Sequence, residues 1–177
     1  HVGQFIHAAS LDELLGQTGR TAGSCGVLAR TDEGCSEHFD RRRSPLITYR
    51  VMTLSDYDSV YDLWIHTPGM GLNTTDDSRE GIGKYLRRNP STCFVALEED
   101  KLVGVILSGH DGRRGFIHHT AVLPDYRGQG IARTLVEHAM NALEAEGIHK
   151  AALVVFARNQ LGNGFWENIH PLERVDT

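Results

Sequence analysis

Long apolar runs and a basic charge balance are both missing from this chain of 177 residues. No apolar stretch approaches the ~20 residues that a membrane-spanning helix needs. The formal net charge of −5 argues against general nucleic-acid binding, although a local basic cluster such as Arg41-Arg42-Arg43 would survive that average. We therefore expect neither a membrane nor a nucleic acid as the partner of this protein.

Cysteine is scarce: the chain holds three, Cys25, Cys35 and Cys93, and no two form a C-x-x-C pair. An odd number without that motif does not suggest a disulfide framework, so a reducing, cytoplasmic location is expected. Cys25, Cys35 and His38 make at most an incomplete metal set, because no fourth ligand lies at a suggestive spacing. The N-terminus also lacks the basic and apolar regions of a signal peptide. We expect no bound metal.

Residues 1–45 differ in character from the rest of the chain. Helical character there is confined to Phe5–Leu15, and residues 16–45 are rich in Gly, Thr, Ser, Arg and acidic side chains with little periodicity. We predict an irregular N-terminal arm or leader over residues 1–45, and a single domain over residues 46–177 that begins after Pro45. The content of 40% hydrophobic and 23% charged residues is that of an ordinary globular domain.

Hydrophobic periodicity predicts a mixed order of strands and helices in the remaining chain. Strands are expected where β-branched and apolar residues alternate or run together, and helices where apolar residues recur every three or four positions. The predicted strands are Ile47–Met52, Thr92–Glu98, Lys101–Ser108, Phe116–Leu123 and Lys150–Ala157, and the predicted helices are Ser55–His66, Asp76–Asn89, Gly130–Glu146 and Asn159–Asn168. This order predicts an α/β (α+β) fold, in which helices flank a mixed sheet.

The most informative stretch is Arg127-Gly128-Gln129-Gly130-Ile131-Ala132, a glycine-rich turn between a predicted strand and a long predicted helix. The first N–H groups of a helix have no partner within it, and the helix dipole is positive at that end. Glycine lets such a backbone approach a phosphate without a Cβ in the way. The turn is therefore a candidate anion site; the alternative is a plain tight turn before a helix. The Gly-Lys-Ser/Thr of a P-loop is absent.

Three features in chain order resemble the GNAT superfamily of acetyl-CoA-dependent N-acetyltransferases. Each is a weak signal alone, but the three together, with matching elements between them, are specific. They are Arg127-x-x-Gly130-x-Ala132, similar to the family's Gln/Arg-x-x-Gly-x-Gly/Ala loop; the strand end Thr120-Ala121-Val122-Leu123-Pro124; and Asn159 before the helix that holds Phe165-Trp166-Glu167. The resemblance covers about residues 47–173 and implies a GNAT-like, mostly antiparallel sheet with splayed central strands flanked by helices.

The resemblance implies acetyl-CoA as the cosubstrate. In such proteins the amides of the loop surround the pyrophosphate, and the splayed strand before it offers backbone groups to the pantetheine arm. The residues expected to bind the cosubstrate are Thr120, Ala121, Val122, Arg127, Gly128, Gln129, Gly130, Ile131, Ala132, Arg133, Asn159 and Trp166.

Two positions that often supply the acid and the base in this family do not carry them here. The position of the usual Tyr holds Trp166, and that of a usual strand Glu looks like Val154, so neither role is transferred. His118 resembles an active-site His of serotonin N-acetyltransferase-like enzymes, and an imidazole with a near-neutral pKa suits a general base. Strand alternation places His118 on one face with Thr120 and His119 on the other. The alternative for His118 is an ordinary sheet histidine.

Other side chains are candidates for the same chemistry. Glu98, on a neighbouring predicted strand, could act as a base through water, and Tyr126 or Tyr85 could act as an acid. The leaving thiolate needs no protein acid, because a thiol of pKa ~8.5 is a fair leaving group. Cys93 would permit a covalent acetyl-cysteine route, but its apolar strand context favours a buried thiol.

The resemblance places the acceptor site at the first two helices and their connection. The residues expected to line or flank it are Trp64, Met70, Leu72 and Asp77, and the turn His110–Gly115 is a candidate for the same cleft. The predicted function is N-acetyl transfer from acetyl-CoA to a primary amine of a small molecule or a peptide. The alternative is a catalytically inactive CoA-binding module that senses or scaffolds. The C-terminal stretch lacks the family's usual last hairpin strand, and an exposed sheet edge would favour a homodimer.

Overall fold

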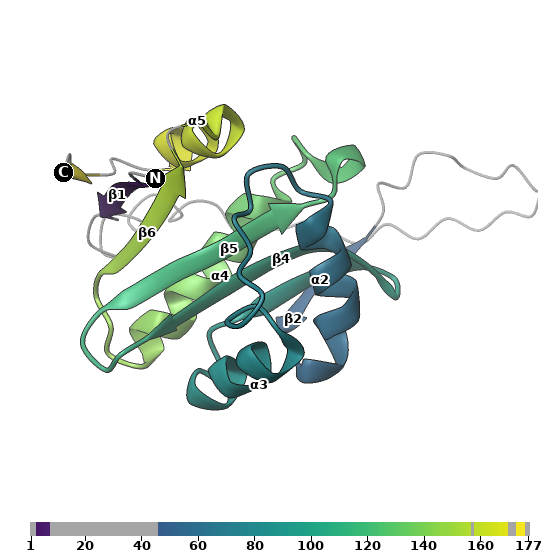
Figure 1. Cartoon of the computed structure of the whole chain (residues 1–177), viewed down its shortest axis with the longest axis horizontal. Helices are drawn as coiled ribbons and strands as arrows, with labels where there is room; N and C mark the ends of the chain where they lie inside the picture. Colours follow the sequence, from purple (N-terminus) through teal and green to yellow (C-terminus); the bar gives the residue numbers. More distant parts are fainter. Residues whose placement is uncertain (1–2, 8–45, 157, 170–172, 176–177) are drawn as a thin grey trace, which may run out of the picture.

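The computed structural model describes residues 3–7, 46–156, 158–169 and 173–175. A seven-stranded sheet forms its centre, with α2 (Tyr57–Ile65) and α3 (Arg79–Arg88) over one face and α4 (Ile131–Ala145) over the other (Figure 1). Two short 3-10 turns, Leu54–Asp56 and Pro124–Tyr126, precede α2 and α4. The predicted mixed α/β architecture is confirmed.

The sheet is antiparallel at every pair of neighbours except one. Its strands are β1 (Gly3–His7), β2 (Ile47–Val51), β3 (Phe94–Glu98), β4 (Lys101–His110), β5 (Gly115–Val122), β6 (Ala151–Phe156) and β7 (Glu173–Val175). They lie in the order β2-β3-β4-β5-β6-β1-β7, and only β5 and β6 are parallel. The exception follows from the chain path, because β5 and β6 are joined by the crossover helix α4 rather than by a hairpin.

Two apolar cores hold the helices to the sheet. On one face α4 packs through residues three or four positions apart, among them Leu135, Ala139 and Leu143, together with Trp166 of α5 (Gln160–Ile169). On the other face α2 and α3 pack against β3 and β4, and Trp64 is fully buried there. The splayed part of the sheet lies between these two layers.

β5 and β6 separate soon after they meet. Their pairing covers Gly115–Ile117 on β5 and Ala151–Leu153 on β6, and both strands continue beyond those residues. The splayed central strands expected from the sequence are therefore confirmed. The gap between them widens toward the start of α4 and the start of α5, because parallel strands end at the same edge of the sheet.

A β-bulge interrupts the alternation of β5 at His118. Leu107 of β4 pairs with His119 and the next residue, Ser108, pairs with Ile117, so His118 is the extra residue. Both histidines consequently lie toward α2 and α3: the His118 ring meets Tyr85 edge-on at 5.5 Å, and the His119 ring lies 4.9 Å from the Trp64 ring. The expectation that His119 points away from His118 is wrong, because simple alternation does not hold across a bulge.

β1 belongs to the sheet although it lies in the segment where we predicted an irregular arm. It pairs antiparallel with β6 on one side and with β7 on the other, and Phe5–His7 is strand rather than the predicted helix. β1 thus occupies the edge of β6 that we expected to be open. The rest of the predicted arm, with Cys25, Cys35 and His38, lies outside the described residues. The homodimer stays a prediction.

Candidate active site

A cavity of about 930 Å³ opens where β5 and β6 separate. The two strands beyond Ile117 and Leu153 form its floor, and the turn before α4 and one side of α5 form its walls. The connection between α2 and α3 closes it on the third side through Thr67–Met70 (Figure 1 shows this connection crossing in front of β5). Elements from the whole domain therefore converge on one site.

The glycine-rich turn forms one end of this cavity. Gly128 and Gly130 adopt left-handed φ angles of 74° and 81°, and no heavy atom lies within 4 Å of the position a Cβ would occupy in either residue. The first helical hydrogen bond of α4 runs from Thr134 N–H to the Gly130 carbonyl, so the amides of residues 131–133 precede it. The turn has the open backbone and the helix-start amides that an anion site requires.

Arginines add positive charge to the same cavity. Arg127, Arg133 and Arg158 contribute to its lining, whereas no carboxylate does among the described residues. Arg127 Nε donates to the Val122 carbonyl at 3.1 Å, which anchors the turn to the end of β5. This charge balance suits a polyphosphate ligand such as CoA. Gln129, also expected in the site, bonds instead to the Asp125 carbonyl and is not among the lining residues.

The end of β5 turns backbone groups toward the gap, and one of them, the Val122 carbonyl, already accepts from Arg127. Leu123 N–H donates to the Val103 carbonyl on the β4 side at 2.9 Å, so alternation directs the backbone groups of Val122 and Thr120 toward β6. Thr120 Oγ1 is buried and has no hydrogen-bond partner in the described structure. An extended ligand with amide groups, such as a pantetheine arm, would satisfy these groups as an added strand does. The residues present therefore fit the CoA arm that the sequence predicts here.

Two further predicted cosubstrate residues line the opposite wall, at α5. Asn159 serves as the N-cap of this helix, because its Oδ1 accepts from Gly162 N–H at 2.9 Å. Trp166 lines the cavity with 7% of its surface exposed and packs edge-on against Phe165 with ring centroids 5.0 Å apart. The indole thus contributes an apolar wall to the cavity.

His118 lies where the cavity meets the α2–α3 side of the sheet. It remains accessible through the cavity, and its ring stacks on Phe116 with centroids 6.2 Å apart. The packed groups around it hinder hydration of the imidazolium and lower the pKa of His118; His119 lowers it further, while Asp77 opposes the shift. His118 is therefore neutral at pH 7 and can accept a proton.

His119 forms a buried pair that the sequence did not reveal. Its Nε2 donates to Asp77 Oδ1 at 2.8 Å, and the other carboxylate oxygen accepts from Asn73 N–H at 2.7 Å. Asp77, predicted as an acceptor-site residue, is thus a structural group that ties the α2–α3 connection to β5. The partners lie 42 positions apart, so no local spacing could have indicated the pair.

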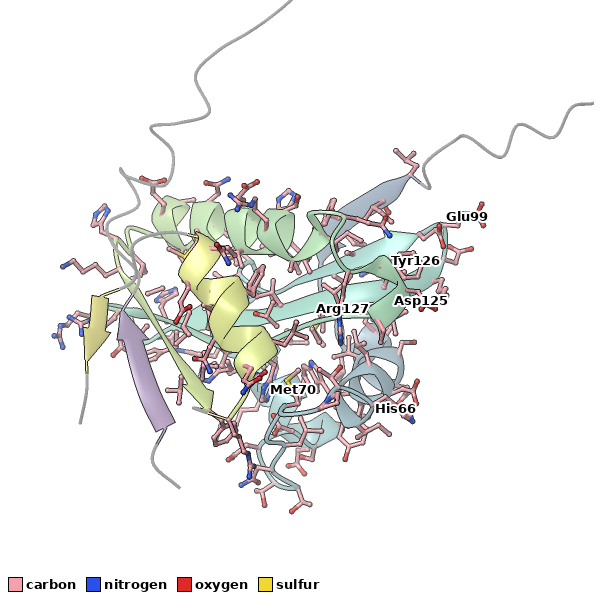
Figure 2. The ribbon with its side chains drawn as sticks, turned by 90° about the horizontal axis from the view of Figure 1, so that it is seen from above. His66, Met70, Glu99, Asp125, Tyr126 and Arg127 are labelled. Carbon is pink, nitrogen blue, oxygen red and sulfur yellow. The ribbon has the colours of Figure 1, made fainter. Side chains whose placement is uncertain are left out.

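The remaining candidates separate into those in the cavity and those outside it. Met70 lines the cavity, and Figure 2 shows Met70 and Arg127 lying between α5 and α2 while His66 and Glu99 point outward. Glu98 is not among the lining residues and accepts a hydrogen bond from Tyr126, a contact that raises the pKa of the phenol. Tyr126 itself lines the cavity.

Three predicted or considered residues lie in or against the core beneath α2 and α3. Trp64 is fully buried and Leu72 packs against that core, so neither lines the cavity. The Cys93 thiol donates to the Ser108 carbonyl at 3.0 Å, and burial raises its pKa to about 12. A thiol held protonated in this way is unsuited to a covalent acetyl-cysteine route.

Neither a metal-binding cluster nor a membrane span is present among the described residues. No group of three or more His, Cys, Asp or Glu side chains is positioned there to hold a metal ion. No helix in the part of the chain that the structure describes is both long and apolar enough to cross a membrane.

Known proteins resemble this chain in both sequence and fold. The profile of the Acetyltransferase (GNAT) family matches residues 57–170. An acetyltransferase of Pectobacterium atrosepticum is 32% identical over 127 residues, which cover 72% of this chain and 88% of that protein. Among solved structures, the PaiA N-acetyltransferase of Thermoplasma acidophilum in complex with coenzyme A is 18% identical with a TM-score of 0.61, over 70% of this chain and 87% of that one.

A second solved structure was determined with both an acceptor and the cofactor bound. Diaminobutyrate acetyltransferase EctA of Paenibacillus lautus, in complex with L-2,4-diaminobutyric acid and coenzyme A, is 23% identical with a TM-score of 0.60, covering 71% of this chain and 75% of that one. At such identities the structural matches establish the fold, whereas the family profile and the sequence relative establish the family. The chain belongs to the GNAT family of acetyltransferases, whose acetyl donor is acetyl-CoA.

Proposed function

We propose that this protein is an N-acetyltransferase that moves an acetyl group from acetyl-CoA to a primary amine of a small molecule or a peptide. The observation that carries the proposal is a single cavity lined both by the anion-binding turn at Gly128–Arg133 and by His118. Acetyl transfer needs a held donor and a group that takes a proton from the amine, and this cavity offers both.

The donor would be held by the turn and by the edge of β5. The amides at the start of α4, with Arg127 and Arg133 beside them, suit the pyrophosphate. The backbone of Thr120 and Val122 suits the amide groups of the pantetheine arm, and the Thr120 hydroxyl gains a partner when that arm is bound.

His118 would act as the general base. The amine nitrogen attacks the thioester carbonyl carbon, a C–N bond forms and the C–S bond breaks. The proton leaves the amine for the neutral imidazole, and CoA departs as a thiolate that takes up a proton from water. Trp166 cannot serve as an acid, and a thiolate leaves without one. Backbone amides at the edge of β5 suit the oxyanion that forms in between.

The test is acetyl transfer with thiol detection, using the wild type and His118→Gln. The glutamine side chain is polar and similar in size to that of histidine, but its amide cannot act as a base near neutral pH. We expect kcat/KM to fall by about 100-fold or more, with the dissociation constant for acetyl-CoA unchanged, because general-base catalysis contributes about 10²–10⁴-fold. Equal turnover by the two proteins would remove His118 from the mechanism.

A different class of function has its own supporting observation. Trp166 and Val154 occupy the two positions where the family resemblance implies an acid and a base, and neither side chain can play that role, which suits a module that binds acetyl-CoA without using it. Calorimetric binding of acetyl-CoA with no acetyl transfer to any amine in a broad panel would favour that alternative and contradict the enzyme.

A further inference from the structure

Three side chains form an apolar shelf on the face of the sheet that carries His118. They are Phe116 of β5 and Val154 and Phe156 of β6; Phe116 is 38% exposed and Val154 is 49% exposed. Phe116 pairs with Ala152, so alternation along β6 puts Val154 and Phe156 on the same face as Phe116. α2 and α3 lie over the β2–β4 side of this face, whereas β6 lies clear of them in Figure 1.

The shelf begins beside the proposed base. Ile117 and Leu153 are the last paired residues of β5 and β6, and the residues that follow them are His118 and Val154. His118 lies on the same face of β5 as Phe116, two residues earlier, and its ring stacks on the Phe116 ring. An amine that gives its proton to His118 therefore has apolar surface of Phe116 beside the reacting group.

The α2–α3 connection bounds the far end of the shelf. A Cβ on Gly71 would lie 2.5 Å from the Phe156 ring, so only glycine lets this connection pass so close. Met70, one residue earlier, lines the same cavity. Phe156 thus lies between the apolar surface of β6 and the α2–α3 connection.

The charges around the shelf disfavour an acceptor that carries a second ammonium group. The described lining residues include no carboxylate, and Asp77 is already bonded to His119 and to the Asn73 amide. Arg158 lies over the Phe156 ring at 5.5 Å and has no carboxylate partner in the described structure. A polyamine would bring a further ammonium group toward that guanidinium with nothing to neutralise it.

We propose that the acceptor is a primary amine on an uncharged apolar body, alkyl or aralkyl, which lies along Phe116, Val154 and Phe156. This inference rests on the proposed N-acetyltransferase function. Polyamines are poor acceptors, because an apolar shelf cannot hold their additional ammonium groups.

A homologous series of linear amines from ethylamine to hexylamine, assayed with saturating acetyl-CoA, tests whether the acceptor chain contacts the shelf. Each methylene that moves onto apolar surface should raise kcat/KM by about two- to fourfold until the shelf is covered. Phe116→Ala and Val154→Ala should flatten this dependence on chain length while ethylamine is affected least. Leu46→Ala is the control, because Leu46 is an exposed apolar residue that precedes β2, the strand at the far edge of the sheet from β6, and it should leave the series unchanged.

Val154→Glu provides a test with the opposite sign. A carboxylate on the shelf should lower kcat/KM for hexylamine and raise kcat/KM for putrescine, a diamine. The ratio of the putrescine value to the hexylamine value should rise by at least about tenfold. Circular dichroism and acetyl-CoA affinity equal to the wild type would show that the variant is folded and loaded.

The possible outcomes distinguish a failure of the apolar-acceptor inference from a failure of the N-acetyltransferase function on which it rests. If spermidine or putrescine is acetylated better than hexylamine by the wild type, the apolar-acceptor inference is wrong and the N-acetyltransferase stands. A series with no dependence on chain length also overturns the inference. If acetyl-CoA binds and no amine is acetylated, the proposed function itself fails.

Discussion

At the scale of single residues, the bulge at His118 decides what the site can do. Without the extra residue, an imidazole at this position would follow strict alternation, and one of the two adjacent histidines would lie on the α4 side. With it, His118 faces the cavity and its neighbour is tied to Asp77. The two adjacent histidines thus have different roles: His118 has a proposed chemical role and His119 has a structural one.

The pH dependence of turnover should report His118. Crowding lowers the pKa of His118 below its ordinary value near 6.5, so the base is neutral and active above that pKa and is lost as the pH falls through it. We expect the ratio of kcat/KM for the wild type to kcat/KM for His118→Gln, in which titration of the amine itself cancels, to decline on the acid side with an apparent pKa below 6.5. A ratio that declines around a pH above about 7, or one that does not change with pH, would contradict this assignment.

The buried pair of His119 and Asp77 should matter for stability. Asp77→Ala leaves the imidazole and the Asn73 amide without their partner, which costs about 2–3 kcal/mol in buried surroundings. Urea unfolding should show a lower midpoint with an unchanged m-value. Asp76→Ala, at the neighbouring exposed carboxylate, is the matched control and should stay within about 0.5 kcal/mol of the wild type. Equal losses in both variants would argue against the pair.

At the scale of elements, local patterns predicted α4 and the turn before it correctly. Apolar residues recur along α4 at helical spacing, and the two glycines before it adopt the left-handed angles that favour glycine. The bulge was missed because the run around His118 carries no local mark of an extra residue. Its presence depends on how β4 pairs with β5, which is a contact between distant parts of the chain.

The glycine turn offers a matched pair of substitutions. Gly128 and Gly147 have φ angles of 74° and 78°, and neither has a heavy atom within 4 Å of the position that a Cβ would occupy. Alanine at either site should cost about 1–2 kcal/mol of stability, because both leave an L-residue in left-handed backbone.

Binding should distinguish the two glycine variants. Only Gly128 lines the cavity, so Gly128→Ala should weaken acetyl-CoA binding by about tenfold in calorimetry, while Gly147→Ala binds like the wild type. Equal affinities in both variants would show that the turn does not hold the donor.

At the scale of the whole molecule, the sheet is completed by a strand from the start of the chain. β1 lies between β6 and β7, so segments from both ends of the sequence extend the sheet beyond β6, which forms part of the cavity floor. The sequence could not predict this, because the stretch of Gly3–His7 lacks regular alternation and gains its strand conformation from pairing with β6.

A proline in β1 should test that dependence. Ile6 is paired with Leu153 on one side and with Arg174 on the other, and Ile6→Pro removes an N–H from the ladder. We expect faster hydrogen exchange of the β6 amides, while those of β3 and β4 keep their protection and act as the internal control. Unchanged exchange in β6 would mean that β1 does not support it.

The donor side of the site was more predictable than the acceptor side. The family resemblance, the fold and acetyl-CoA as cosubstrate are confirmed, because they depend on a short contiguous loop and on element order. The acceptor side depends on which faces of α2 and its following connection reach the cavity. Trp64 and Leu72 pack in or against the core instead, and neither of the shelf residues Phe116 and Val154 was predicted as an acceptor-site residue.

Acetyl transfer to hexylamine, followed by thiol release with wild type and His118→Gln side by side, decides whether the cavity between β5 and β6 is a catalytic site. Both proteins should bind acetyl-CoA equally, and the wild type alone should acetylate the amine at a substantial rate. Binding of acetyl-CoA without turnover of hexylamine or any other primary amine by the wild type would contradict the proposed N-acetyltransferase.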